Sequence, residues 1–450
     1  MARFVVVGVI APPTGDAFIL DVYRDVLLVT HTGVLATQGN SSFAGLLMAE
    51  SSQTVLIDGS VLGYHGIAVL GNDSVITIGA TGSVMGDYAA MFLQGSSHRV
   101  VNFGQILATD HGIVSVGSIW FENFGRIIGD YAVLSGAGAD YLRNAGQIIG
   151  TVDLGDGNDI FDGSGGQMQG WIYLGGGNDT GIGGSLADIF DDGDGQDEVF
   201  GGAGNDTIWV SNDQDADTFD GDAGVDALRF VATTAVTVDL ARGTAYSAQT
   251  GADLIEGFER VITGAGADKL YGDALANTLQ AGDGNDSLYG GAGNDRLFGG
   301  EGVNVIDGGA GDDRLFGASS RDTIYGGTGN DIIYGSYDTD HMGGGTGNDR
   351  FIWRDVGELF RNTSPANFDR IVDFTPGQDR IDLSQIDWNG SGADNAFSFR
   401  GTAAITGAGQ VAIRQAGAFT YVDISWQTAG VASSILLDGT LTLTTSDFLL

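Results

Sequence analysis

The sequence predicts an all-β protein, a right-handed parallel β-solenoid in which an N-terminal β-helix runs into a β-roll with a C-terminal β cap. First, the 450 residues include 77 glycines but only four prolines. Flexible linkers bring proline and serine with them, so glycine without proline indicates repeated tight turns. Second, short runs of Val, Ile, Leu, Tyr and Phe are interrupted by Gly, Asn and Asp, with little helical periodicity. Third, the chain repeats itself at fixed periods.

Residues 1–150 repeat every 21 to 23 residues and predict the β-helix. The apolar run from Phe4 to Ala11, before Pro12 and Pro13, is interpreted as its first strand, because one basic residue and a short run make a poor signal peptide. A period of this length matches one coil of a three-sided helix, with Asn before Gly forming a stacked turn. The repeated step, Gly-x-Ile or Gly-x-Val, occurs at Gly59–Val61, Gly82–Val84, Gly104–Ile106, Gly125–Ile127 and Gly146–Ile148.

Residues 263–352 hold ten copies of a nine-residue unit, G-G-x-G-x-D-x-U-x, where U is apolar. The acidic or amide position is occupied by Asp268, Asn277, Asp286, Asp295, Asn304, Asp313, Asp322, Asp331, Asp340 and Asp349. The apolar position is occupied by Leu270, Leu279, Leu288, Leu297, Ile306, Leu315, Ile324, Ile333, Met342 and Phe351. Six Gly-rich residues predict a turn, and three residues predict a short strand whose U side chain points inward.

A degenerate block of the same unit is predicted over residues 151–228. It contains Asp159, Asp179, Asp188, Asp197 and Asp206, then slips by two residues to Asp217 and Asp226. Residues 229–262 are expected to be spacer strands, and residues 353–450 the C-terminal domain.

Calcium is the cofactor that this repeat predicts. Two nonapeptides complete one coil, so Asp268 should lie over Asp286 and Asp313 over Asp331, and carboxylates stacked in this way repel unless a cation lies between them. Oxygen ligands without nitrogen or sulfur favour several Ca²⁺ ions over zinc. The candidate ligands are the aspartates of both blocks and the turn glycines Gly284, Gly293, Gly311, Gly329 and Gly347. Asn277 and Asn304 are weak ligands, and Leu275, Ser320 and Asp338 replace a turn glycine. The alternative is a polar solenoid without metal.

This repeat resembles that of the RTX, or hemolysin-type calcium-binding, family, and the likeness extends from Gly155 to Ile352. The resemblance implies a parallel β-roll. The segments FDRIVDFTPGQDRIDLSQID (368–387), YVDISW (421–426) and SDFLL (446–450) resemble the C-terminal domain of serralysin-type proteins. That likeness implies a cap on the roll and an uncleaved signal, including Asp447, for a type I secretion ABC exporter.

Charge and composition narrow the function classes. The chain has 58 acidic and 19 basic residues, and 36 of the acidic but only eight of the basic ones fall in residues 151–352. Such a polyanion is not expected to bind nucleic acid or anionic membranes, and no apolar run is long enough for a membrane span. The absence of cysteine excludes disulfides and thiolate sites. We expect a chain that stays expanded in a cytosol poor in calcium and folds outside the cell, where calcium supplies folding free energy.

The biological role is less constrained by the sequence. The zinc-protease motif H-E-x-x-H and the lipase motif G-x-S-x-G are absent. A non-enzymatic structural, adhesive or interaction role is favoured, with self-association or a cell-surface polysaccharide as partner. A β-helix lyase, hydrolase or epimerase acting on polysaccharide remains the alternative. A membrane-damaging toxin is disfavoured for want of an amphipathic helical segment. The candidate residues for the enzyme are Asp87, Asp110, Asp130, Asp140, Arg99, Arg126 and Arg143.

Overall fold

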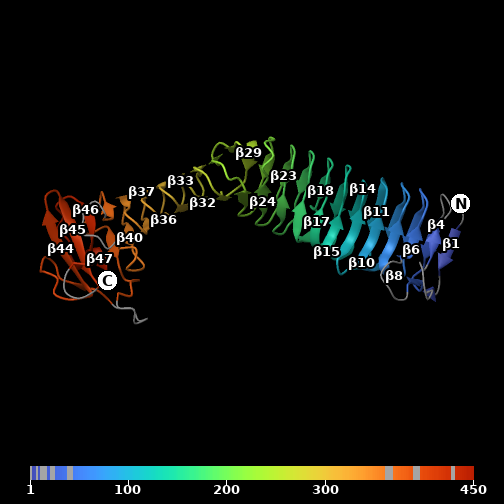
Figure 1. Ribbon diagram of the computed structural model, residues 1–450, viewed down its shortest axis with the longest axis horizontal. Helices are drawn as coiled ribbons and strands as arrows, with labels where there is room; N and C mark the ends of the chain where they lie inside the picture. The colour runs from blue at the N-terminus through green and yellow to red at the C-terminus, as the bar shows by residue number, and fades with distance from the viewer. Residues whose placement is uncertain are drawn as a thin grey trace. The chain divides into compact units, whose positions relative to one another are not determined.

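The chain folds as an all-β parallel solenoid. The computed structural model describes residues 3–6, 9–10, 18–20, 26–37, 44–359, 368–388, 396–426 and 431–450, and none of these lies in an α-helix. Contacts divide the chain into two compact units, each built of a sheet A and a sheet B (Figure 1). The first unit comprises Met1–Arg229 and Thr250–Phe258, and the second comprises Phe230–Gln249 and Glu259–Leu450. The two units therefore share the segment predicted to be a spacer.

Sheet A of the first unit is a continuous parallel stack in which each strand pairs with the next coil's strand. Its strands in pairing order are β1 (Arg3–Val6), β4 (Val26–Val29), β7 (Thr54–Ile57), β9 (Val75–Ile78), β11 (His98–Asn102), β14 (Ile119–Asn123), β16 (Tyr141–Asn144), β18 (Ile160–Asp162), β21 (Thr180–Ile182), β23 (Glu198–Phe200), β25 (Thr218–Asp220) and β29 (Gly251–Glu256).

Sheet B of the first unit contributes one or two strand segments per coil. Its strands are β2 (Val9–Ile10), β3 (Ile19–Leu20), β5 (Val34–Ala36), β6 (Ala44–Met48), β8 (Ser60–Val69), β10 (Ser83–Leu93), β12 (Gln105–Ala108), β13 (His111–Ser115), β15 (Arg126–Leu134), β17 (Gln147–Asp153), β19 (Gln167–Gln169), β20 (Trp171–Tyr173), β22 (Ile189–Asp191), β24 (Thr207–Val210) and β26 (Ala227–Phe230). The run from Phe4 to Ala11 contains β1 and β2 in place of one strand, while residues 7–8 and 11–17 lie outside the described residues.

The repeated glycine step of the β-helix is confirmed by the register. The apolar residue of each step pairs with its equivalent on the next coil and is fully buried. The expected stacked turn is also present: Nδ2 of Asn102 donates to Oδ1 of Asn123, and Nδ2 of Asn123 donates to Oδ1 of Asn144, both at 2.8 Å. All three amides are buried, so each coil's turn is held to the next by a satisfied polar contact.

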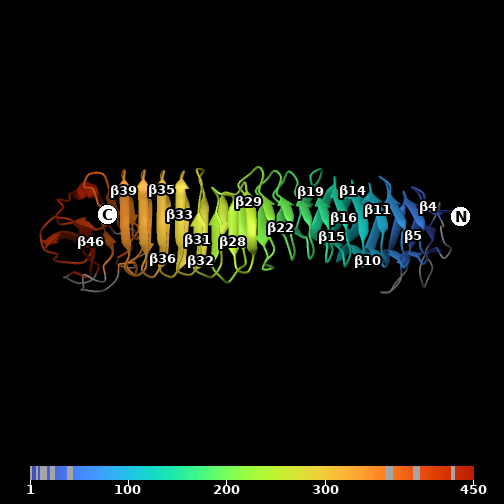
Figure 2. The same ribbon diagram turned by 90° about the horizontal axis from the view of Figure 1, so that it is seen from above.

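The second unit begins with an antiparallel hairpin and continues as the roll. Its sheet A contains β27 (Val236–Asp239), β28 (Thr244–Ser247), β31 (Lys269–Tyr271), β33 (Ser287–Ala292), β35 (Val305–Ala310), β37 (Thr323–Thr328), β39 (His341–Thr346) and β41 (Arg370–Ile371). Its sheet B contains β30 (Arg260–Ile262), β32 (Thr278–Asp283), β34 (Arg296–Glu301), β36 (Arg314–Ser319), β38 (Ile332–Ser336), β40 (Arg350–Ile352), β42 (Arg380–Asp382) and β47 (Phe448–Leu449). Figure 2 shows β31, β33, β35 and β39 side by side.

The core of the roll consists of the U side chains that the repeat predicted to point inward, one column from each sheet. All ten are 0 to 1% exposed, and burying a side chain of this size stabilises the folded state by about 1.5–3 kcal/mol. Strands 18 residues apart are paired in parallel, so successive nonapeptides contribute their strands alternately to sheet A and sheet B. The stack thus places every second acidic position on the same edge.

The C-terminal residues of the second unit extend the roll and then leave it. β41 pairs with β46 (Ser433–Asp438), which forms an antiparallel meander with β45 (Phe419–Ser425) and β44 (Gln410–Ala416). β43 (Ser398–Phe399) pairs with β44 in parallel. Arg370 ties the roll to this meander through a bidentate ion pair with Asp438, at 2.6 and 2.7 Å. The short 3-10 helix η2 (Thr445–Asp447) precedes β47, which pairs with β42.

Candidate metal centres

Acidic side chains in the roll form two ladders, one on each turn edge. In each ladder the backbone N–H of one residue donates to the side-chain Oδ1 of its equivalent on the next coil. Asp268 donates to Asp286 and Asp313 to Asp331, both at 2.8 Å, which confirms the predicted stacking. The A-edge ladder of the second unit is Asp268, Asp286, Asn304, Asp322, Asp340 and Asp369. The B-edge ladder is Asn277, Asp295, Asp313, Asp331, Asp349 and Asp379.

The degenerate block of the first unit has the same construction. Donor–acceptor distances are 2.6 to 3.3 Å along its A edge and 2.7 Å along its B edge. The A-edge ladder of this unit is Asp140, Asp159, Asp179, Asp197, Asp217 and Asp253, and the B-edge ladder is Asp188, Asp206 and Asp226. The two-residue slip at Asp217 is accommodated in the turn, so the ladder continues.

The second carboxylate oxygen of most ladder aspartates is buried and makes no hydrogen bond. These side chains are at most 3% exposed, and an unpartnered carboxylate oxygen is costly in such surroundings. The aspartates with an unpartnered Oδ2 are Asp140, Asp159, Asp179, Asp197, Asp206, Asp253, Asp268, Asp286, Asp295, Asp313, Asp322, Asp331, Asp340 and Asp349. A row of such oxygens is the donor set that a hard cation requires.

At seven of these fourteen aspartates, a glycine five residues earlier leaves room for this oxygen. A Cβ added at Gly326 would collide with Oδ2 of Asp331, and one added at Gly308 with Oδ2 of Asp313. The backbone of these glycines is not left-handed, so space and not conformation excludes a side chain. The oxygen consequently lies against the backbone of its own turn.

Asn304 shows what surrounds that second position. Its Oδ1 accepts from the N–H of Asp286 at 3.0 Å, like a ladder aspartate, and its Nδ2 donates to the carbonyl oxygens of Gly300 and Gly302 at 3.1 and 3.2 Å. At a ladder aspartate, Oδ2 takes the place of this Nδ2. The negatively charged carboxylate oxygen then faces the partly negative carbonyl oxygens of the turn. The position equivalent to Gly302 is that of the predicted ligands Gly284, Gly293, Gly311, Gly329 and Gly347. The last four have left-handed φ values of 116° to 143°, and glycine adopts this conformation without strain.

Burial raises the pKa of the ladder carboxyls in the metal-free protein. The pKa of Asp313 rises to about 6, that of Asp331 to about 7 and that of Asp159 to about 8. Loss of hydration is the main cause, and the donated backbone hydrogen bond opposes it. Nearby carboxylate charges add to the rise, from ladder neighbours at Asp159 and Asp331 and from Asp312 and Asp307 at Asp313. Ionising the metal-free ladder is therefore unfavourable, and a bound cation would remove that cost.

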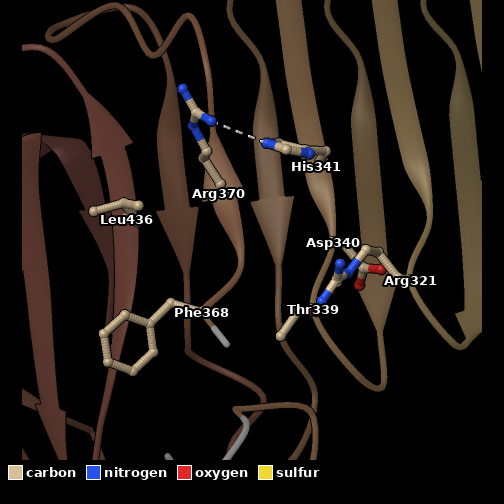
Figure 3. A pocket seen from close by; sticks show the side chains of 7 residues that line it. All are labelled: Arg321, Thr339, Asp340, His341, Phe368, Arg370 and Leu436. Carbon is tan, nitrogen blue, oxygen red and sulfur yellow. Dashed lines mark hydrogen bonds between the residues drawn. The ribbon is translucent and has the colours of Figure 1, made fainter. Parts of the chain in front are cut away.

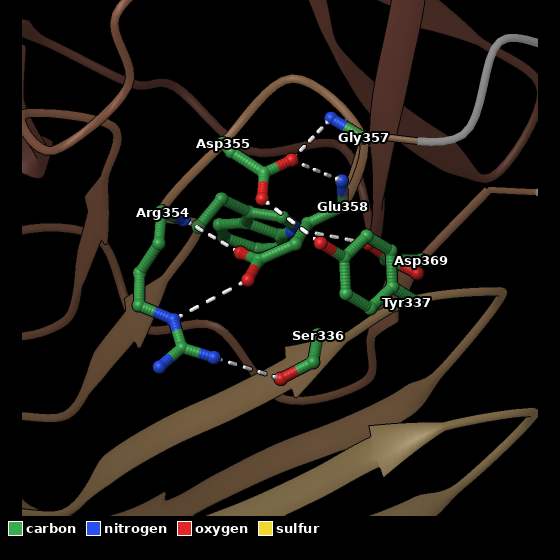
Figure 4. A network of polar contacts seen from close by, with 8 residues as sticks. Ser336, Tyr337, Arg354, Asp355, Gly357, Glu358 and Asp369 are labelled. Atoms are coloured by element: carbon green, nitrogen blue, oxygen red, sulfur yellow. Dashed lines mark hydrogen bonds and ion pairs between the residues drawn. The ribbon is translucent and has the colours of Figure 1, made fainter.

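The ladders of the roll end on aspartates whose two oxygens are both hydrogen-bonded. Oδ2 of Asp369 accepts from Nε1 of Trp353 at 2.8 Å, and Oδ2 of Asp379 accepts from the N–H of Thr375 at 2.7 Å. Figure 4 shows Asp369 beside a polar network in which Glu358 accepts from Arg354. These two residues fit the role of ladder ends better than that of ligands.

Asp188, among the predicted ligands of the first unit, resembles these ends. Its Oδ2 accepts from the N–H of Gly184 at 2.7 Å. It is therefore a weaker candidate ligand than Asp206 on the same edge, whose Oδ2 is unpartnered.

A pocket of about 200 Å³ lies beside the A-edge ladder near its last coil. Figure 3 shows Asp340 next to Arg321 and Thr339, and Arg370 directed at His341. Arg370 donates to Nε2 of His341 at 3.3 Å, and Arg321 donates to Thr339 at 3.0 Å. The cationic groups of this pocket are thus bonded to neighbours and leave Oδ2 of Asp340 unpartnered.

Sequence reasoning missed four ladder residues, namely Asp140, Asp253, Asp369 and Asp379. A signal for each was present, since an apolar residue follows two positions later and is at most 4% exposed, as in every repeat. The period hid them, because they lie 19 to 36 residues from their ladder neighbours in place of 18.

Two of the candidate enzyme residues, Arg99 and Asp140, line the same pocket, beside Trp120 and Tyr141. Arg99 pairs with Glu122 at 2.7 Å and Arg143 with Asp162 at 3.6 Å. Asp140 is a ladder residue, and Nε of Arg126 donates to Gln147. Asp110 lies 3.4 Å from His111, while Asp87 and Asp130 are exposed.

Side chains alone do not complete a coordination shell. Within the described ranges, no three His, Asp or Glu side chains converge as a metal-binding group. A cation at a ladder position would therefore also need backbone carbonyl oxygens, such as those of Gly300 and Gly302 that accept from Asn304. None of the helices in the described part of the chain has the length and apolarity to cross a membrane.

Comparison with known proteins identifies the repeat. The family model of the RTX calcium-binding nonapeptide repeat matches residues 173–208, 182–216, 255–274, 271–306, 289–324 and 316–351. The chain thus carries RTX repeats, which bind several calcium ions, in both blocks. No curated protein matches the chain.

Two solved structures are similar in part. A subunit of the mannuronan C5-epimerase of Azotobacter vinelandii is 28% identical over 41% of this chain and 78% of its own, with a TM-score of 0.19. The extracellular lipase of Serratia marcescens is 15% identical over 62% of this chain and 42% of its own, with a TM-score of 0.17. The chain thus spans less than half of the lipase.

Proposed function

We propose that this RTX-repeat protein is exported unfolded, folds on calcium outside the cell, and then acts as a non-enzymatic extracellular interaction protein. One observation carries the calcium part: buried Oδ2 atoms without a partner recur along the ladders, and half of the fourteen lie beside a glycine that leaves room for them. Proteins with RTX repeats are typically secreted.

In this proposal each cation lies between a ladder aspartate and turn carbonyls. Asp313 and Asp331 would contribute Oδ2, and the glycines equivalent to Gly302, such as Gly311 and Gly329, would contribute carbonyl oxygens. The Oδ1 atoms continue to accept from the backbone of the preceding coil. Calcium would thus replace unfavourable contacts among oxygens with coordination bonds.

The proposed route is a type I ABC exporter. Asp447 is buried, and its carboxylate accepts from the N–H groups of Gly377 and Thr444 at 2.7 and 2.6 Å. Phe448 is 5% exposed and pairs with β42. A signal in residues 446–450 would therefore be readable only before the second unit folds, which agrees with export of a chain that calcium has not yet folded.

Circular dichroism of the full chain during a calcium titration tests the proposal. We expect a weakened β signal and a low melting temperature in excess EGTA, and a cooperative rise of the β signal toward the calcium concentrations found outside cells, ~10⁻⁴–10⁻³ M. The same spectrum with and without calcium would contradict it. Equilibrium dialysis on the same samples should give several bound ions per chain.

A further inference from the structure

Arginines of the roll line up on one outward face of the second unit. On sheet B, Arg260 and the residue after each B-edge ladder position pair in register from strand to strand. The column runs Arg260, Thr278, Arg296, Arg314, Ile332, Arg350 and Arg380. We call its five arginines the arginine stripe. Four of them are among the eight basic residues of 151–352, so half of the positive charge of the most acidic segment lies in one line.

The stripe is not neutralised by the protein's own acids. Within the described residues, ion pairs of the stripe are limited to that between Arg350 and Asp382. Arg296 and Arg314 are exposed and lie opposite each other on the neighbouring strands β34 and β36. Neither forms an ion pair with an acidic side chain among the described residues. Like charges facing each other on neighbouring strands, about 4.8 Å apart, destabilise a sheet. This arrangement costs stability and suits an anion supplied from outside.

An aromatic column lies beside the stripe on the same outward face. Phe298, Phe316 and Tyr334 follow the stripe positions by two residues and stack with centroids 4.7 and 4.6 Å apart, nearly parallel. The guanidinium of Arg354 lies over the ring of Tyr334 at 5.1 Å. The face therefore combines a row of cations with a flat, partly exposed apolar row.

We propose that this face binds an acidic polysaccharide that carries one carboxylate per sugar, with the chain lying along the stripe. A guanidinium binds a carboxylate through two parallel hydrogen bonds, and regular cations on successive strands suit a polymer with regular anions. The aromatic row would pack against the apolar faces of the sugar rings. The inference rests on the proposed function, because calcium must first neutralise the adjoining ladder residues Asp295 and Asp313.

The test uses the full chain in saturating calcium and a fluorescently labelled hexagalacturonate, with binding read as anisotropy. We expect saturable binding that weakens as salt is raised, since exposed charges are screened, and that is lost in EGTA. Cellohexaose, which is neutral, should not compete. Equal competition by oligoglutamate or oligodeoxythymidine would overturn the assignment to a polysaccharide and leave only a general anion site.

Variants locate the site. Arg296→Gln with Arg314→Gln should weaken binding about tenfold. Lys269→Gln, at the same repeat position on sheet A, is the matched control and should bind like the parent. Ile332→Arg fills the gap between Arg314 and Arg350 and should strengthen binding about threefold, a gain that loss of packing cannot produce. An unchanged affinity of the double variant would overturn the inference.

Calcium titrations of the same proteins separate the two proposals. If the parent folds on calcium but does not bind hexagalacturonate, the polysaccharide inference fails and the calcium proposal stands. If the parent does not respond to calcium, the calcium proposal fails and the inference falls with it. A double variant with an unchanged calcium midpoint and weaker binding supports both.

Discussion

Replacing Asp331 by asparagine separates the cost of its charge from its value as a ligand. Its Oδ1 accepts from the N–H of Asp313 at 2.8 Å, and an asparagine keeps that bond. Its Oδ2 is buried without a partner, and the substitution replaces this oxygen with NH₂. Asn304 shows that the nitrogen can donate to two turn carbonyls at such a position.

The size of the stability change in the metal-free protein follows from the pKa of Asp331. Burial raises the pKa of Asp331 from its usual 3.8 to about 7, and the charges of Asp313 and Asp349 add to the rise. Above both values an ionised Asp331 destabilises the metal-free fold by about 4 kcal/mol. Desolvating the new amide returns about 1–3 kcal/mol of that. At pH 8 in EGTA, D331N should therefore be more stable than the parent by about 2 kcal/mol.

In calcium the sign reverses. The variant lacks one carboxylate ligand, so the calcium midpoint should rise about tenfold or more. Thermal unfolding in EGTA and calcium titration, both followed by circular dichroism, measure the two effects. A variant less stable than the parent in EGTA would refute the buried-charge argument, and an unshifted midpoint would refute the ligand role. The reciprocal change, Asn304→Asp, should bind one more ion and lower the metal-free stability.

The remaining predictions concern pH, space and backbone strain. Burial raises the pKa of Asp159 and Asp197 to about 8. Protonation of these two carboxyls therefore stabilises the metal-free fold relative to the unfolded chain. This contribution to the free energy of unfolding is fully present below about pH 4 and is lost as the pH rises toward 8. Melting in EGTA should occur at a higher temperature at pH 5 than at pH 8. The double variant Asp159→Asn with Asp197→Asn should reduce this difference in melting temperature. Gly326→Ala places a Cβ against Oδ2 of Asp331 and should destabilise the calcium form by about 1–3 kcal/mol; calcium unfolding curves like the parent's would count against the crowded turn. Ser320 has a left-handed φ of 77°, so Ser320→Gly should raise stability in calcium by about 1 kcal/mol. Asp369→Asn keeps one of the two acceptor oxygens, and its NH₂ then faces either Nε1 of Trp353 or the N–H of Asp340. This variant should be less stable but should leave the calcium stoichiometry unchanged, whereas loss of an ion would show that this ladder end is a ligand.

The arginine stripe was predictable from the repeat period in one part and depends on tertiary pairing in another. Arg296 and Arg314 are 18 residues apart, so their alignment follows from the period alone. Arg380 is 30 residues from Arg350 and joins the column only because β42 pairs in register with β40. The ladder ends at Asp369 and Asp379 arise in the same way.

The sequence by itself determined the solenoid, the register of two nonapeptides per coil and the aspartates that stack. These features depend on turn glycines and an apolar residue at short, fixed spacing, so each repeat specifies its own turn and strand, as at Asp313 and Leu315. Only the tertiary structure decided which carboxylate oxygens lack a partner, where the ladders end and which coil Asp253 joins. Those outcomes depend on contacts across insertions such as the hairpin β27–β28. The length of an insertion does not determine at which coil the chain rejoins the stack of strands.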